Sequence, residues 1–432
     1  MSRPARSSFV LKLLLLAFLL APALTGCSYL TIPAKDDVSS WPLIHKGKND
    51  APVYNSAVIK GRITGAPKDT STIIVAQPAA VNWALTDWLA VHPSGSFMFY
   101  LPQGRYHLYT FTDYNRDGTY QTDELSGAYG SFSSPAEIAA RENELVNGIV
   151  IPVERPAGRA TLLPADSAIP KAADIVRQMT QNGQVLKIYH EYFAAENAQT
   201  GYWRPSSFLK ALGAHIYLTE EYTPRKIPVL FVHGTEGSPH NWIYLYLRMD
   251  RSRYQPWFFY YPSGIRLGLA AALLKEELSE LHQKYRFPKM GLVAHSVGGL
   301  TSRSFLTRFA GDNDLHFIKL FITFATPWSG FSAADASQII THKSIPVWMD
   351  LGTQSPFIKT TLAGKLPPGV RHYIFYGNND TLCGNKALDD RATAVAVEAF
   401  AFESDHTSIL SDRKASLKFN EILNRELGNS KK

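Results

Sequence analysis

The segment KMGLVAHSVGGLTSR, residues 289–303, constrains the fold of this chain more than any other stretch. It predicts a buried strand, a tight turn that carries Ser296 and a helix that begins at Val297. A serine at such a turn is strained, and its hydroxyl group is exposed above the sheet. Strand and helix must pass close together there, so small neighbours are needed, and Ala294 and Gly298 flank the serine. A serine that merely caps the helix is the alternative, but a cap does not require small residues on both sides.

The C-terminal part, residues 171–432, alternates apolar runs of strand length with helical patterns, which is typical of a mostly parallel sheet covered by helices. Strands are predicted at 214–219, 228–232, 257–261, 290–294, 318–324, 372–376 and 399–402. Helices are predicted at 242–249, 269–285, 297–309 and 414–425. A further helix is predicted over 171–195, because Ile175, Met179 and Val185 share one side of it.

Residues 54–154 consist of short runs rich in Val, Ile, Tyr, Phe and Thr, separated by Pro and Gly. This pattern predicts a small antiparallel β-sandwich domain. Its segment FMFYLPQGRYHLYTFTD resembles a hairpin of prealbumin-like or carboxypeptidase-regulatory sandwiches, in which a strand turns at Gly and returns. The following residues 155–170 are rich in Pro and Ala and predict a linker between two domains.

Residues 1–26 predict a targeting segment, because a basic start precedes an apolar run too short for a membrane span. The run ends in Leu-Thr-Gly-Cys27, which resembles a bacterial lipobox. That resemblance implies cleavage before Cys27, lipid attachment to it and, with Ser28 next, an outer-membrane location facing the periplasm. Residues 27–53 then predict a tether. The alternative is an ordinary cleaved signal with an incidental cysteine.

The charge and cysteine content of the chain exclude some classes of function. The formal net charge of the 432 residues is +7, and three of these positive charges lie in the targeting segment. The remainder is too small to indicate a nucleic-acid partner. Cys383 is the one cysteine besides Cys27, so no intramolecular disulfide is expected, and we interpret Cys383 as a small buried apolar residue.

One stretch of the N-terminal domain fits the calcium-loop pattern D-x-N-x-D-G-x5-E, with Asp113, Asn115, Asp117 and Glu124 as the ligands. Alternate oxygen-bearing side chains can converge on one cation there, so a structural calcium ion is a hypothesis. The flanking residues predict strands rather than the helices of an EF-hand. The alternative is a polar hairpin tip, in which Asn, Asp and Gly residues stabilise a turn.

Two backbone N–H groups are predicted to form an oxyanion hole. The apolar strand IPVLFV ends in His233-Gly234-Thr235, and the N–H of Thr235 is one candidate donor. The N–H of Val297, directly after the serine, is the other. Such donors stabilise the negative charge that develops on a carbonyl oxygen during acyl transfer. We expect His233 to position this loop through a backbone hydrogen bond, and His295 to be a packing or pocket residue.

A carboxylate and a histidine follow the last two predicted strands. Asp380 ends the run HYIFYGNND, and His406 lies in FESDHTSIL. The order Ser296, Asp380, His406 is the one expected for a catalytic triad on a sheet of this kind. Other acids nearby remain candidates for the acid of the triad: Asp389, Asp390 and Asp405.

Residues 200–425 resemble an α/β-hydrolase of the lipase/esterase kind. They are similar to bacterial lipases with an A-H-S-x-G turn and to GPI-inositol-deacylase-like lipases through the segments HGTEGSPHNW, YYPSG, AHSVGG, TFATPWSG and DHTSIL. The resemblance implies Ser296 as nucleophile, His406 as base, Asp380 as acid, and Thr235 with Val297 as oxyanion donors. No cofactor or metal is implied for catalysis.

The leading hypothesis is therefore a membrane-tethered carboxylic-ester hydrolase, with a lipid or other small ester as substrate. Residues 331–370 are long for a connection and are expected to form either a lid over the site or an ordinary surface helix. A transacylase with the same triad is a close alternative. A binding protein of the cell envelope that only uses a hydrolase scaffold is another.

Overall fold

The computed structural model describes residues 56–79, 87–91, 95–154, 180–309, 311, 315–332, 334–335, 345–383 and 388–428. The chain divides into a unit of Met1–Pro42 and a unit of Leu43–Lys432, and every described residue lies in the second. The predicted targeting segment, Cys27, the tether and the linker 155–170 lie outside the described residues. Within the described ranges, no helix has the length and apolar character needed to cross a membrane.

Residues 56–152 form two β-sheets. The first has the strand order β4-β1-β8, and the second the order β3-β2-β5-β6, with β7 paired to β5. The strand bounds are Ser56–Thr64 (β1), Thr72–Pro78 (β2), Asp87–Ala90 (β3), Ser96–Pro102 (β4), Gly104–Thr112 (β5), Leu125–Ala128 (β6), Ile138–Ala140 (β7) and Leu145–Pro152 (β8). Apolar side chains from both sheets share one buried cluster, among them Ile59, Ile74, Phe99 and Leu108.

Two details of this region differ from the sequence-based expectation. First, β1 and β8 are parallel, so the sandwich is not wholly antiparallel. Second, β4 and β5 do not form a hairpin, because β4 pairs with β1 and β5 pairs with β2 in the other sheet. The bend at Gln103 therefore carries the chain from one sheet to the other. Only the tertiary pairing partners reveal this, since each strand has the same local pattern either way.

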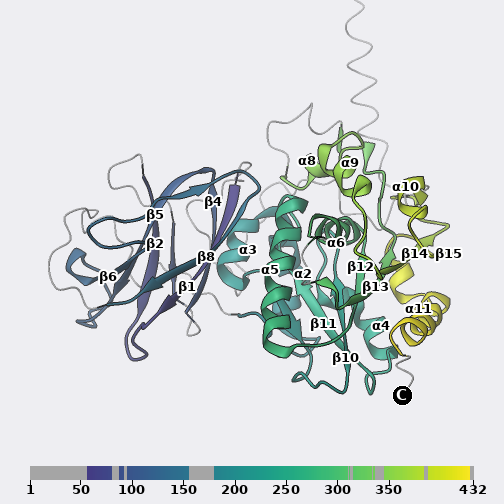
Figure 1. Cartoon of the computed structure of the whole chain (residues 1–432), viewed down its shortest axis with the longest axis horizontal. Coiled ribbons are helices and arrows are strands. Elements are labelled where there is room, and N and C mark those ends of the chain that lie inside the picture. The colour runs from purple at the N-terminus through teal and green to yellow at the C-terminus, as the bar shows by residue number, and fades with distance from the viewer. Residues whose placement is uncertain are drawn as a thin grey trace, which may run out of the picture. The chain divides into compact units, whose positions relative to one another are not determined.

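The C-terminal part contains a seven-stranded sheet with the order β15-β14-β13-β12-β10-β11-β9 (Figure 1). All neighbouring pairs are parallel except β11 with β9. The strands are His215–Leu218 (β9), Ile227–Val232 (β10), Tyr254–Tyr260 (β11), Met290–His295 (β12), Ile318–Phe324 (β13), Arg371–Gly377 (β14) and Glu398–Phe402 (β15). Most of these strands are buried along nearly their whole length, as expected for strands covered on both faces.

The helices are Ala195–Trp203 (α2), Pro205–Leu212 (α3), Ile243–Arg248 (α4), Leu267–Tyr285 (α5), Val297–Arg308 (α6), Trp348–Leu351 (α8), Pro356–Ala363 (α9), Asp390–Thr393 (α10) and Arg413–Glu426 (α11). Buried residues of α5 and α6 share one apolar cluster with one face of the sheet. Residues of α4 and α11 share a second cluster with the other face. The sheet is therefore the middle of three layers (Figure 1).

The seven strands and four helices predicted for this part are present, with ends shifted by up to three residues. The helix predicted over 171–195 is wrong in its described portion, because Val185 forms a β-bridge with Leu218 and the next described α-helix, α2, begins only at Ala195. Helices α2 and α3 were not predicted. Helix α5 begins two residues earlier than predicted, since the Asp350 carboxylate accepts a hydrogen bond from the N–H of Leu267 at 2.7 Å.

One face of the first sheet packs against the α/β part. Val58 and Met98 lie in the same buried cluster as Leu209 of α3 and Ile216 of β9. Residues two apart on a strand share a face, so Lys60 projects on the same side as Val58. Most of β4 and the first half of β1 are thus buried on both faces, which explains the continuous apolar run of β4.

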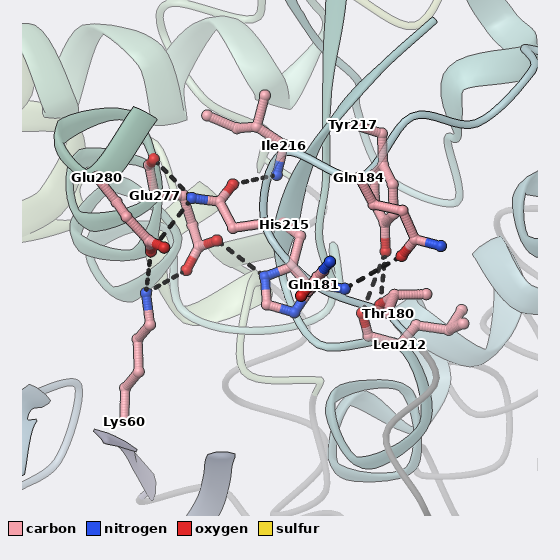
Figure 2. Close-up of polar contacts among 11 residues, drawn as sticks. Lys60, Thr180, Gln181, Gln184, Leu212, His215, Ile216, Tyr217, Glu277 and Glu280 are labelled. Carbon is pink, nitrogen blue, oxygen red and sulfur yellow. Dashed lines mark hydrogen bonds and ion pairs between the residues drawn. The ribbon is translucent and has the colours of Figure 1, made fainter. Parts of the chain in front are cut away.

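Lys60 takes part in a buried ionic network with α5 and β9 (Figure 2). Its Nζ lies 2.6 Å from Oε1 of Glu277 and 3.5 Å from Oε2 of Glu280. The other oxygen of Glu277 lies 2.8 Å from Nδ1 of His215, and the Glu277 side chain has no exposed surface. Burial alone would raise the pKa of Glu277, but attraction to Lys60 and His215 outweighs burial and lowers this pKa.

Candidate active site

Ser296 lies between β12 and α6 in a backbone conformation that is unusual for a residue with a side chain, with φ 53° and ψ −132°. The turn leaves no room for larger neighbours. A Cβ atom added at Gly298 would lie 2.4 Å from the backbone oxygen of His233, and one added at Gly299 would lie 2.0 Å from Oγ1 of Thr326. The first turn of α6 therefore lies so close to the end of β10 and to Thr326 after β13 that both positions require glycine.

The structure brings Ser296, His406 and Asp380 together. Oγ of Ser296 lies 2.9 Å from Nε2 of His406, and Nδ1 of His406 lies 2.9 Å from Oδ2 of Asp380. All three side chains are buried. Asp380 follows β14 and His406 follows β15, so the loops at the carboxyl ends of neighbouring parallel strands supply both groups.

Asp380 is held as a carboxylate that can accept the Nδ1–H of His406. Its Oδ1 accepts hydrogen bonds from the backbone N–H groups of Leu382 and Cys383, at 3.0 and 2.8 Å. Burial by itself raises the pKa of Asp380, but the hydrogen bond and attraction of His406 and these N–H groups outweigh it and lower the pKa. With the proton on Nδ1, Nε2 of His406 is free to accept the Ser296 proton.

The three other acids considered from the sequence contact different groups. Asp389 pairs with Arg391 and accepts a hydrogen bond from Ser329. Asp390 begins α10, and Asp405 accepts the backbone N–H groups of residues 407 and 408. Among the described residues, Asp380 is the acid that pairs with His406.

The loop after β10 lies against Ser296. A Cβ atom added at Gly234 would lie 2.8 Å from Cβ and 3.3 Å from Oγ of Ser296. Thr235 is the next residue, and its backbone N–H has no hydrogen-bond partner among the described residues; the same holds for the N–H of Val297. Two free N–H groups near one hydroxyl can bind an oxyanion.

Two further histidines shape the site. Nδ1 of His233 donates to the backbone oxygen of Gly234 at 2.7 Å, as expected from the sequence, and burial lowers the pKa of His233 to about 4. Nε2 of His295 donates to the backbone oxygen of His406 at 2.8 Å. Burial, followed by repulsion from His406, lowers the pKa of His295 to about 3, so it is neutral. The sequence reasoning missed that His295 positions the loop of His406.

Cys383 is buried and lies beside the same histidine. Its Sγ is 3.4 Å from Nδ1 of His406 and donates to the backbone oxygen of Ala325 at 3.3 Å. The prediction of a small buried residue is confirmed, but its contact with His406 was not foreseen.

The loop of the calcium hypothesis is closed by its own hydrogen bonds. Asp113 accepts the backbone N–H groups of Asp117 and Gly118, both at 3.1 Å, and Glu124 accepts that of Asn115 at 3.3 Å. Asp113 and Glu124 are buried and have no basic partner within ion-pair distance among the described residues. Burial, followed by repulsion from Asp113, raises the pKa of Glu124. Buried, mutually repelling carboxylates fit a cation, although their oxygens do not gather in one group of three.

The segment expected to form a lid is described only in part. Helices α8 and α9 are present, whereas residues 336–344 lie outside the described residues, so the lid stays a prediction. The fully buried Arg303 of α6 donates to the backbone oxygens of Thr361 and Leu362, at 3.1 and 3.3 Å. These bonds attach α9 to the helix that follows Ser296.

Residues 267–383 match the family model described as alpha/beta hydrolase of unknown function (DUF915). The comparison with curated proteins found no match. Among solved structures, the mature lipase BlEst2 of Bacillus licheniformis is 23% identical, with a TM-score of 0.39, over 47% of this chain and 94% of its own. The monoacylglycerol lipase of Paleococcus ferrophilus is 14% identical, with a TM-score of 0.37, over 49% of this chain and 97% of its own.

The topology of the sheet and the matched segment together lead to one conclusion about architecture. A mostly parallel sheet covered by helices on both faces carries a strained serine turn after β12, and the family model covers this turn. The C-terminal part of the chain has an α/β-hydrolase fold.

Proposed function

We propose that the protein is a carboxylic-ester hydrolase of the serine lipase/esterase type, with Ser296 as nucleophile, His406 as general base and Asp380 as the acid that orients it. The observation that carries this proposal is the hydrogen-bonded chain from Oγ of Ser296 through the imidazole of His406 to Oδ2 of Asp380, with 2.9 Å at each step. A surface serine that only capped a helix would need neither the positive φ nor this chain.

In the proposed reaction, His406 takes the proton of Ser296 while Oγ attacks the ester carbonyl carbon. The N–H groups of Thr235 and Val297 stabilise the oxyanion, and protonated His406 gives its proton to the leaving alcohol. Water, deprotonated by His406, then attacks the acyl-enzyme and releases the acid. A transacylase would differ only in that a second alcohol replaces this water.

The substrate proposed is a lipid or other acyl ester, because the lipobox-like sequence at Cys27 would anchor the enzyme to the outer membrane, facing the periplasm. The proposal includes a structural calcium ion held by Asp113, Asn115, Asp117 and Glu124. No catalytic step depends on it.

The test is hydrolysis of nitrophenyl esters by purified Ser296→Ala, with Ser304→Ala as a matched control on the same helix. Ser304 is buried and its hydroxyl has no partner among the described residues, so its loss should leave the rate near wild type. We expect Ser296→Ala to lose a factor of about 10⁴ or more in kcat. Equal rates for the two variants would refute the mechanism. If a fluorophosphonate probe labels neither the Ser296→Ala variant nor the Ser304→Ala variant, the result favours the non-enzymatic binding protein.

A further inference from the structure

Three side chains that commonly bind metal ions converge behind the imidazole of His406. A carboxylate oxygen of Asp380, Sγ of Cys383 and a ring nitrogen of His406 all lie within 4.8 Å of one another, and in the described ranges no other set of three such residues does. They come from two loops, one after β14 and one after β15. Cys383 has no place in the proposed ester chemistry, so its position here needs a separate explanation.

The spacing of these atoms is close to that of a tetrahedral zinc site. Zinc bonds of about 2.0–2.3 Å at tetrahedral angles place nitrogen about 3.3 Å from oxygen and about 3.6 Å from sulfur. The observed separations are 2.9 Å from Nδ1 to Oδ2 and 3.4 Å from Nδ1 to Sγ. Each is a few tenths of an ångström short, which a small movement of the two loops would correct.

The donor set also selects the class of metal. A thiolate with an imidazole suits zinc and cadmium, whereas calcium and magnesium prefer oxygen ligands only. Asp380 already accepts two backbone N–H groups through Oδ1, so Oδ2 is the oxygen available to a metal. Its orientation is fixed by these bonds, as is common for carboxylate ligands.

We propose that Asp380, Cys383 and His406 form an inhibitory binding site for a thiophilic divalent cation, represented here by zinc. The metal forms bonds to Sγ, Nδ1 and Oδ2. The thiol proton of Cys383 is released to solvent, and the Nδ1 proton of His406 moves to Nε2, so the imidazole stays neutral. The inhibitory effect rests on the proposed function, whereas the binding does not.

Inhibition follows from the position of the displaced proton. With a metal on Nδ1, the Nε2 atom that faces Oγ of Ser296 at 2.9 Å carries a hydrogen and can no longer accept the serine proton. General-base catalysis contributes roughly 10²–10⁴-fold, so zinc at saturation should lower the esterase rate by roughly 10²-fold or more. A chelator should restore it.

Direct binding is measured by calorimetric titration of the purified protein, carrying no polyhistidine tag, with zinc chloride. We expect one strong site in the wild type and in Ser296→Ala. Cys383→Ala should bind at least about tenfold more weakly because one of three ligands is missing. Cobalt(II) should give a thiolate charge-transfer absorption in the near ultraviolet with the first two proteins and not with Cys383→Ala. Cys383→Ser, which keeps the side-chain volume, serves if the alanine variant does not fold.

Inhibition is measured as the esterase rate of each protein with zinc relative to the rate of the same protein without zinc. The wild type should be inhibited and Cys383→Ala should not be at the same zinc concentration. Equal inhibition of both, or no zinc binding by the wild type, would overturn the proposed metal site. If the wild type binds zinc through Cys383 but shows no esterase activity, the metal site is supported and the proposed function is refuted.

Discussion

Replacing Lys60 with methionine should destabilise the protein far more than loss of an ordinary surface charge. Methionine keeps most of the apolar stem but removes the ammonium group 2.6 Å from Glu277. The Glu277 carboxylate would remain fully buried and, among the described residues, would keep His215 as its ion-pair partner. Removing one member of a buried ion pair typically costs about 3–5 kcal/mol, and we expect about 3 kcal/mol because His215 stays in place.

The measurement is urea denaturation of wild type and Lys60→Met near neutral pH, followed by tryptophan fluorescence. Lys418→Met is the matched control, since Lys418 also lies 2.6 Å from a glutamate, Glu421, but that pair is exposed. Exposed pairs contribute about 0.2–1 kcal/mol. If Lys60→Met loses no more stability than Lys418→Met, the buried network does not stabilise the fold.

The stability difference between wild type and Lys60→Met should also depend on pH. The pKa of Glu277 is lowered in the folded protein, so its contribution is present above the ordinary value of 4.5 and is lost as the pH falls through the folded value. In Lys60→Met the Glu277 carboxylate lacks the lysine ammonium group. Protonation of Glu277 then removes the free-energy cost of burying an unpaired charge. The stability gap between wild type and variant should therefore narrow below pH 4.5. A gap that widens on acidification would contradict the assignment of a charged pair.

Three further outcomes are expected. Gly298→Ala should cost about 3 kcal/mol of stability, measured by urea denaturation, because the new Cβ atom would lie 2.4 and 2.6 Å from two backbone oxygens. Gly311→Ala is the control and should be neutral, because a Cβ atom there has no neighbour within 4 Å. His295→Leu should lower kcat/KM about tenfold while the circular dichroism spectrum is kept, since it loses the hydrogen bond that positions His406; an unchanged rate would show that this bond is dispensable. The melting temperature of the purified protein should be about 3 °C or more higher with calcium than with a chelator, and Glu124→Gln should abolish this difference. If calcium changes neither the melting temperature nor the heat measured in a titration, the proposed calcium site is wrong.

The elements that the sequence predicted well are those with strong local patterns. The strands of the α/β part are short apolar runs between turn residues, and β13 has the predicted bounds of Ile318–Phe324. The turn at Ser296 was recognisable because its small neighbours are adjacent in the chain. The order of serine, aspartate and histidine was likewise readable, and Asp380 was the acid that directly followed a strand.

The features that the sequence did not predict all depend on contacts between distant segments. The parallel pairing of β1 with β8 joins residues almost ninety positions apart, and no local pattern distinguishes it from an antiparallel pair. A helix was predicted over 171–195 from the spacing of Ile175, Met179 and Val185, but in the structure Val185 pairs with Leu218 of β9 instead. The contacts of His406 with His295 and Cys383 arise only when three loops meet.

The double-sided burial of β1 and β4 has a consequence for how the chain can be made. Lys60 is synthesised 217 residues before Glu277, and Val58 and Met98 also precede most of the cluster that covers them. The first sheet therefore keeps an uncovered apolar face while translation continues, and a nascent chain in this state is open to self-association. A truncated protein that lacks the first sheet would in turn have an uncovered apolar surface on its α/β part, because Leu209 and Ile216 would be exposed to water.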